Sequence, residues 1–202
     1  MSNPRPYATL LAKGEERRQR ILTVAQRLLT RNGWRSITLG QIAREAGVSP
    51  AGLLHHFESK EQLLHAVLDA RDAYDEASRD MPGDIIERIE GRAERFRQAP
   101  DLVSMFAVLL IENLSPDAPL HERFLNRYRS AVDIVAEGIR EGQRAGKYGT
   151  DLDPAVKAVE IIAFLNGMET SWLLDPSIPL TEVFQGYARS LARELAPSSG
   201  DS

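Results

Sequence analysis

The chain has 202 residues, of which 43% are hydrophobic, so it is long enough for one or two compact domains with a buried core. It contains no cysteine, which excludes disulfides, thiolate metal sites and cysteine nucleophiles. The net charge is −4, but residues 1–60 carry +6 and the remainder carries −10.

The N-terminal region begins with a segment that has no helical pattern. Residues 1–13 contain Pro4 and Pro6, so we expect this end to be frayed. Residues 15–32 then place apolar side chains at spacings of three and four, which predicts an amphipathic helix that stops at Gly33. Its polar side carries the arginines at positions 17, 18, 20, 27 and 31. This basic face favours contact with a polyanion, although a purely solubilising role is an alternative.

Residues 38–57 predict two short helices joined by a tight turn. Thr38 and Gln41 have the spacing of a capping box at the start of the first helix. Gly47 follows that helix at the point where a left-handed residue would end it. Ser49 and Pro50 then suit the cap and the first position of the second helix. The geometry is that of a helix-turn-helix, in which the second helix enters the DNA major groove, but a plain αα-hairpin shares these signals.

The side chains of the second short helix divide into two faces. We expect Val48, Leu53 and Phe57 to pack inward against the first short helix. The outward face is then formed by Ala51, Gly52, Leu54, His55 and His56.

A further helix is predicted to start after Ser59, with an apolar stripe at residues 63–68. Lys60 lies in its first turn, where a cation is unfavourable because the helix dipole already makes that end positive. A DNA phosphate would supply the missing anion, and a solvated lysine is the alternative.

At this point the residues resemble a known family. The matching residues, in order and without gaps, are Gly33-Trp34, Ser36-Ile37-Thr38, Ile42-Ala43-Arg44-Glu45-Ala46-Gly47-Val48-Ser49, Leu53, His56-Phe57, Ser59-Lys60-Glu61 and Leu63-Leu64. Residues from about 15 to 70 resemble the DNA-binding domain of TetR/AcrR-family transcriptional regulators. The resemblance implies a three-helix DNA-binding domain at residues 14–74, in which Thr38 and Lys60 hold phosphates and residues 49–56 enter the major groove.

The predicted DNA-binding residues are Thr38, Gln41, Ser49, Pro50, Ala51, Gly52, Leu54, His55, His56 and Lys60. Two positions depart from the family pattern, because Leu54 stands where a tyrosine is usual and Gly52 where a threonine is common. Leu54 cannot donate a hydrogen bond, so we expect an apolar contact there, such as one with a thymine methyl group.

The rest of the chain is predicted to be helical. Proline and glycine punctuation divides it into helices at residues 84–98, 101–114, 120–145, 155–174 and 180–195, and no strand-like alternation is present. We therefore predict an all-α fold of about nine helices, with a regulatory, ligand-binding and dimerisation domain at residues 75–196. Residues 196–202 are small and polar and are expected to be frayed.

The last two predicted helices are the most apolar. A helix that is apolar around most of its girth has to be covered on both sides. The family resemblance implies that these helices form a four-helix dimer interface, although both could be interior to a monomer. The predicted interface residues are Phe164, Met168, Trp172, Phe184, Tyr187 and Leu191.

The resemblance also implies a pocket for a small apolar or amphipathic ligand among the middle helices. Polar groups placed among aromatic and methionine side chains are suited to orienting such a ligand, although ordinary core packing explains the same pattern. The candidates are Met105, Phe106, Leu109, Glu112, Asn113, Phe124, Tyr128, Asn166 and Glu169.

An enzyme is disfavoured by the residues present. The chain has four histidines, and it lacks a GxSxG motif, a glycine-rich phosphate loop after a strand and a metal-ligand cluster, so no cofactor or metal is expected. It also lacks a signal-peptide core and an apolar run of about 20 residues, so we expect a cytoplasmic protein that does not enter membranes.

The predicted function is a dimeric repressor that binds a palindromic DNA operator and is released by a ligand. The alternative is a constitutive or protein-gated DNA binder whose helical domain only dimerises.

Overall fold

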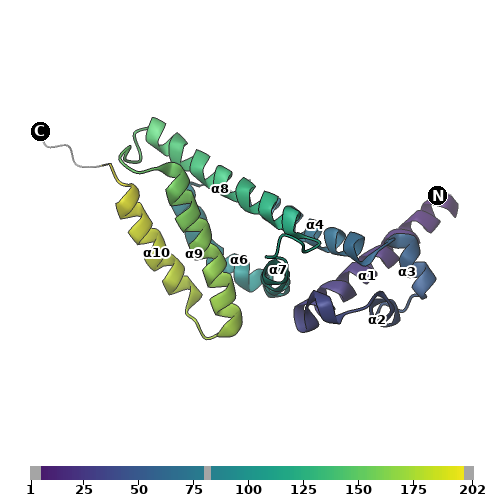
Figure 1. Ribbon diagram of the computed structural model, residues 1–202. Helices are drawn as coiled ribbons and strands as arrows, with labels where there is room; N and C mark the ends of the chain where they lie inside the picture. The colour runs from purple at the N-terminus through teal and green to yellow at the C-terminus, as the bar shows by residue number, and fades with distance from the viewer. Residues whose placement is uncertain (1–5, 80–82, 198–202) are drawn as a thin grey trace, which may run out of the picture.

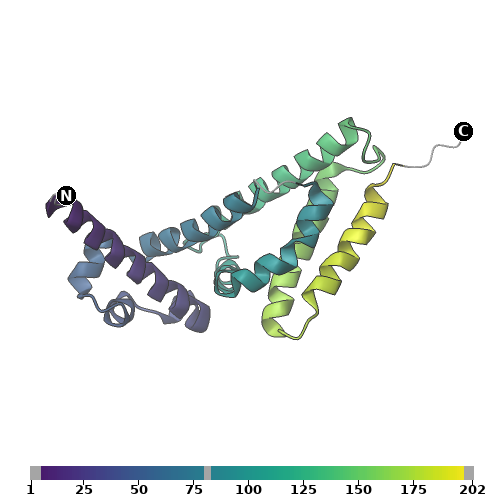
Figure 2. The ribbon, with the colours of Figure 1, turned by 180° about the vertical axis from the view of Figure 1, so that it is seen from behind.

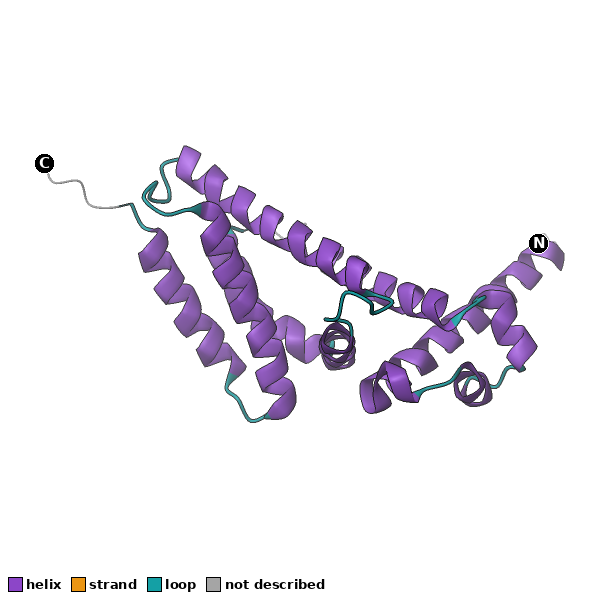
Figure 3. Ribbon diagram, in the orientation of Figure 1, coloured by secondary structure: helices purple, strands orange, loops and turns teal. Residues whose placement is uncertain are grey.

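A computed structural model describes residues 6–79 and 83–197, which form ten α-helices and no strand (Figures 1 and 3). The helices are α1 (Pro6–Ser36), α2 (Leu39–Glu45), α3 (Pro50–His56), α4 (Lys60–Arg79), α5 (Ile85–Glu90), α6 (Arg92–Gln98), α7 (Pro100–Glu112), α8 (His121–Arg144), α9 (Pro154–Leu174) and α10 (Leu180–Leu195). The all-α prediction is confirmed. Among the described residues, no helix combines the length and the apolar character needed to cross a lipid bilayer.

The first helix is longer than predicted. It begins at Pro6, so the expectation of a frayed chain was wrong for residues 6–13. Proline is tolerated in the first turn of a helix, where its missing N–H has no intrahelical partner to lose. The backbone leaves the helical region at Gly33, with φ 69° and ψ 169°, where the sequence predicted the helix to stop. Residues 1–5 and 198–202 lie outside the described residues.

The four N-terminal helices pack around one hydrophobic cluster. Its fully buried members include Ile21 of α1, Ile42 of α2, Leu53 of α3 and Leu64 of α4. The same cluster continues into α7 and α8 through side chains such as Met105. The predicted domain boundary after residue 74 therefore falls inside α4, and the apolar core crosses it.

The C-terminal helices surround a second hydrophobic cluster. It joins residues of α5, α6, α7, α8, α9 and α10, including Phe96, Ile139, Ile161 and Phe184. The helix predicted at residues 84–98 is divided at Gly91, which accounts for ten helices where about nine were expected.

The whole chain is elongated, as two opposite views show (Figures 1 and 2). Helices α2 and α3 lie beside α1 near the N-terminus, and α10 lies at the other end. The long helix α8 runs between these two regions.

Candidate DNA-binding face and internal cavity

The turn between α2 and α3 is held by capping bonds. The hydroxyl of Thr38 accepts a hydrogen bond from the N–H of Gln41 at 3.1 Å, and the hydroxyl of Ser49 accepts one from the N–H of Gly52 at 3.0 Å. Gly47 adopts φ 64°, a left-handed conformation that glycine enters without a Cβ penalty. Pro50 occupies the first turn of α3, so the two N-caps and the turn are confirmed. Of the capping box, only the bond to the Thr38 hydroxyl is formed among the described residues.

The two faces of α3 are separated as predicted. Leu53 and the capping residue Phe57 are 0% and 1% exposed and belong to the first cluster. Leu54 on the opposite side is 47% exposed. The ten predicted DNA-binding residues are all exposed or half-buried, and they lie on α2, α3, their N-caps and the first residue of α4. The fold thus presents the first turns of α3 to the outside.

Positive charge surrounds this face. Burial lowers the pKa of His56, and the neighbouring His55, Arg17 and Arg18 lower it further. The guanidinium of Arg18 also lies 5.4 Å from the ring centre of Phe57 at the end of α3. Helix α1 therefore brings its arginines next to α3, where they would add attraction for a phosphate backbone.

Lys60 has a structural contact that the sequence did not suggest. Its ammonium donates a hydrogen bond to the backbone carbonyl of Trp34 at 2.7 Å and lies 3.8 Å from the indole centre. Partial burial lowers the pKa of Lys60. Lys60 therefore connects the start of α4 to the end of α1. If Lys60 contacts a phosphate, its ammonium does so while it is held in place by Trp34.

A cavity of about 480 Å³ that is partly open to solvent lies in the C-terminal part, bounded by residues of α5 to α9 and of the segments beside them. Its size is within the usual range for small-molecule sites. Five of the predicted ligand residues line it, namely Phe106, Phe124, Tyr128, Asn166 and Glu169. Glu169 is 3% exposed, so its carboxylate belongs to the interior.

The other four ligand candidates are not among the residues that line this cavity. Met105 and Leu109 are 0% exposed and pack into the first cluster, because α7 turns that face toward the N-terminal helices. Glu112 accepts a hydrogen bond from the N–H of Trp34 at 2.7 Å. Asn113 donates to the carbonyl of Leu109 and accepts from a backbone N–H after α7, which closes the loop there.

Comparison with known proteins finds a family match in the N-terminal region. The family model described as "Bacterial regulatory proteins, tetR family" matches residues 21–67, which include α2 and α3. The transcriptional regulator UidR of Escherichia coli K12 is 30% identical over 128 residues, covering 63% of this chain and 55% of UidR. Residues 21–67 therefore match the TetR family of bacterial regulatory proteins.

Two further comparisons extend over the helical body. The transcriptional repressor KstR2 of Mycolicibacterium smegmatis is 26% identical, covering 92% of this chain and 93% of KstR2. The structure of SmeT in complex with triclosan superimposes with a TM-score of 0.75 at 19% identity, covering 92% of this chain and 93% of that one. The matching segment of UidR, by contrast, spans little more than half of that relative's length.

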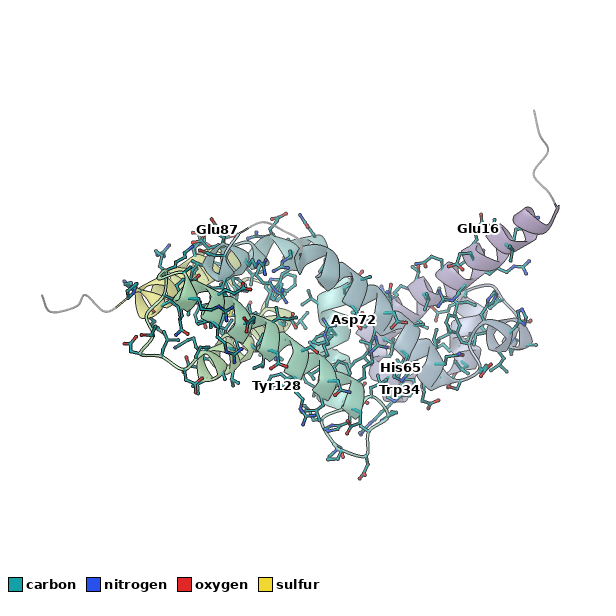
Figure 4. The ribbon with its side chains drawn as sticks, turned by 90° about the horizontal axis from the view of Figure 1, so that it is seen from above. Glu16, Trp34, His65, Asp72, Glu87 and Tyr128 are labelled. Atoms are coloured by element: carbon teal, nitrogen blue, oxygen red, sulfur yellow. The ribbon has the colours of Figure 1, made fainter. Side chains whose placement is uncertain are left out.

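The cavity wall is connected to α4 by charged side chains. Arg127 lines the cavity, lies 4.7 Å from the ring centre of Phe106 and forms an ion pair with Asp72 of α4. Arg123 donates to Asp72 at 2.6 Å and to the backbone carbonyl of His65 at 2.8 Å. Figure 4 shows His65 and Asp72 along α4, with Tyr128 on the neighbouring α8. The helix that leads into the DNA-binding region is thus bonded to a cavity-lining residue.

The predicted dimer residues separate into two groups. Phe184 and Leu191 are 0% and 1% exposed and pack into the second cluster, so they do not contribute to an outer surface. The reason is that the apolar stripe of α10 is used within the chain, against α5 and α6. Phe164, Met168, Trp172 and Tyr187 are half-buried, and the rings of Phe164 and Tyr187 stack at 3.7 Å.

Helix α9 carries a different exposed stripe. Val156, Val159 and Leu174 are 56%, 43% and 88% exposed, and the small residues Ala163 and Gly167 lie exposed between them. The signal that could have identified this stripe is the run of small or apolar residues at spacings of three and four along residues 156–174. The sequence analysis instead assigned the interface mainly to larger aromatic and aliphatic side chains.

The sequence prediction also missed several cavity residues. Arg88, Arg92 and Arg127 were not considered, because charged side chains on amphipathic helices usually face solvent. Gly138 was missed as well, because a glycine has no side chain that would indicate a role in lining a cavity.

Proposed function

We propose that this chain is a sequence-specific transcriptional repressor of the TetR family that binds a palindromic operator as a homodimer and is released by a small molecule. The observation that carries the proposal is the outward face of α3, held by the Ser49 cap on a rigid turn and flanked by the arginines of α1. In a helix-turn-helix this part of the second helix contacts base edges, while neighbouring basic and backbone groups bind phosphates.

Within this proposal the ten predicted residues have separate roles. His55, Leu54 and the small residues at positions 50–52 face the bases, where Leu54 offers an apolar surface to a thymine methyl group. Thr38, Gln41, Ser49, His56 and Lys60 lie at helix ends or sides, where they contact the phosphate backbone.

The exposed stripe of α9 supports the dimer. Ala163 and Gly167 allow close approach of a second helix, and the larger apolar residues Val156, Val159 and Leu174 would be removed from water on association. A dimer places two copies of α3 in successive major grooves, about 34 to 36 Å apart, which a single short helix cannot do.

The dimer is tested by a substitution that leaves the subunit intact. A Cβ at Gly167 would meet no atom within 4 Å, so Gly167→Arg is accommodated by the single subunit but places a bulky cation in the proposed interface. We expect this variant to sediment as a monomer, whereas Ser130→Arg, at an exposed position of α8, remains a dimer. Equal masses for the two variants would refute this interface.

DNA binding is tested by the salt dependence of affinity for a mixed-sequence duplex. We expect the binding constant to fall steeply between about 50 and about 200 mM salt, because each neutralised phosphate contributes roughly −0.9 to the log–log slope. Substitution of Arg17 and Arg18 by glutamine should reduce this slope. A slope near zero for the unsubstituted protein would contradict a role in DNA binding.

The cavity supports the ligand-released form of the proposal. SmeT, whose fold this chain shares, has a complex with triclosan. In this chain the ion pair between Arg127 and Asp72 would carry a change at the cavity to α4 and so to the position of α3. Arg127→Gln should then leave operator affinity measurable but reduce the effect of any releasing ligand.

A further inference from the structure

The cavity wall contains more cationic than acidic side chains. The five cations are Arg88, Arg92, Arg95, Arg127 and Lys147, and the three acids are Asp84, Glu141 and Glu169. Buried apolar residues such as Phe106 and Ile161 form much of the remaining wall. The space is therefore apolar with an excess of two positive charges.

Most of these charges already have partners within the chain. Lys147 donates to Asp84, and Arg127 pairs with Asp72. The buried Glu169 likewise has an interaction partner. Arg88 and Arg92 differ, because the side chain of neither makes a hydrogen bond or ion pair within the part of the chain whose side chains the structure describes.

Arg88 and Arg92 lie on the same wall of the cavity. They lie at the end of α5 and the start of α6, on either side of the break in the helix at Gly91. Both side chains are among the residues that line the cavity. Arg88 is exposed and Arg92 is half-buried, whereas Ile89 between them is 4% exposed. The two guanidinium groups therefore belong to the outer part of the wall, and the apolar residues lie deeper.

On this arrangement we propose that the ligand of the cavity is an amphipathic anion, with an apolar body inside and a carboxylate, sulfonate or phosphate group held by Arg88 and Arg92. The inference rests on the proposed function of the cavity as a ligand site. Guanidinium groups bind such oxyanions through charge-assisted, often bidentate hydrogen bonds. A cationic amphiphile of the same size would meet two uncompensated positive charges instead.

The test uses probes that share an apolar body and differ only in the charge of the head group. One set is 2-naphthylacetate, 2-(2-naphthyl)ethanol and 2-(2-naphthyl)ethylamine, and the second is decanoate, 1-decanol and decylamine. Dissociation constants are measured by isothermal titration calorimetry on the full chain. We expect each carboxylate in which the body fits to bind about tenfold more tightly than its alcohol, and the amine to bind more weakly than both.

Two kinds of variant assign the binding to this site. The double variant Arg88→Gln and Arg92→Gln should reduce the preference for carboxylate over alcohol to about twofold or less. Arg129→Gln, which removes an exposed cation of α8 that does not line the cavity, should leave it unchanged. Gly138→Leu should abolish binding of all probes, because Gly138 lines the cavity and a Cβ there meets no atom within 4 Å.

The outcomes separate this inference from the proposed function. Tighter binding of the alcohol or the amine, blocked by Gly138→Leu, would overturn the anionic ligand while preserving the cavity as a ligand site. A carboxylate preference that survives the double arginine variant would also overturn it. If no probe of either set binds, both the anionic ligand and the ligand-site role are overturned, and DNA binding is judged separately by its own titration.

Discussion

Two glycines of α8 allow the packing of the cavity wall to be tested in depth. Gly138 and Gly142 lie one turn apart on the same helix, and both line the cavity. A Cβ added to Gly138 meets nothing within 4 Å. A Cβ added to Gly142 overlaps ring carbons of Tyr148 and lies 2.9 Å from its Cγ. Tyr148 is 6% exposed, so its ring has little room to move.

The expected stabilities of Gly138→Ala and Gly142→Ala follow from this difference. Alanine stabilises a helix interior by about 1 kcal/mol relative to glycine, and this gain is common to both variants. Forcing extra volume into a packed site destabilises by about 1 to 3 kcal/mol, and only Gly142→Ala incurs that cost. The two variants should therefore differ by about 1 to 3 kcal/mol in the free energy of unfolding.

Thermal denaturation followed by circular dichroism measures this difference. For a chain of this length 1 kcal/mol corresponds to about 2 to 4 °C in Tm, so Gly142→Ala should melt about 2 to 12 °C below Gly138→Ala. Adding Tyr148→Leu should recover part of the loss in Gly142→Ala. Equal melting temperatures for the two alanine variants would refute the packing of Tyr148 on Gly142.

Three further predictions concern the caps, the DNA-binding face and an ion pair. Ser49→Ala removes the cap of α3 and should lower stability by about 1 kcal/mol in chemical denaturation, and an unchanged midpoint would contradict the cap. Lys60→Ala should weaken binding to all duplexes alike and reduce the salt slope by about 1, whereas His55→Ala should change sequence preference more than slope. Burial opposes ionisation of Asp84, but the hydrogen bond and charge of Lys147 together with the backbone N–H groups of Glu87 and Ile86 outweigh it and lower the pKa of Asp84 below its usual 3.8. Its stabilising contribution is thus complete above pH 3.8 and lost as the pH falls through the lowered value, so acid unfolding of Lys147→Gln should lack the part of this component that Lys147 supplies.

The sequence predicted the local structure of the helix-turn-helix well because its signals are local. The bonds of Thr38 and Ser49 join residues three apart, and the left-handed turn at Gly47 needs only its own backbone. Such features depend little on the rest of the fold. The contact of Lys60 with Trp34 spans 26 positions, and no local pattern predicts it.

The cavity was harder to predict because it depends on the rotation of helices. On α7, Phe106 faces the cavity while the adjacent Met105 is buried against the N-terminal helices. Both fit the same apolar stripe, so only the packing of α1 against α7 decides between them. Arg88 and Arg92 are charged residues of the kind that usually face solvent. They line a cavity only because α5, α6 and α8 pack together in the fold.

The proposed dimer face was only partly anticipated by the sequence, for a related reason. Phe184 and Leu191 have the apolar character of an interface, but α10 uses them for its own core. The small exposed residues of α9, such as Gly167, are weak signals in a sequence. A small residue indicates an interface only through the second helix that packs closely against it, and the sequence does not show that helix.

The central claim is that two copies of α3 read a symmetric DNA site, and selection from a random duplex pool tests it most directly. Bound duplexes are recovered over successive rounds at low salt and sequenced. The account predicts enrichment of a palindrome whose half-sites are separated by about one helical turn or a multiple of it. It also predicts that His55→Ala changes the enriched bases within each half-site. Recovery of duplexes with no enriched sequence would contradict the claim.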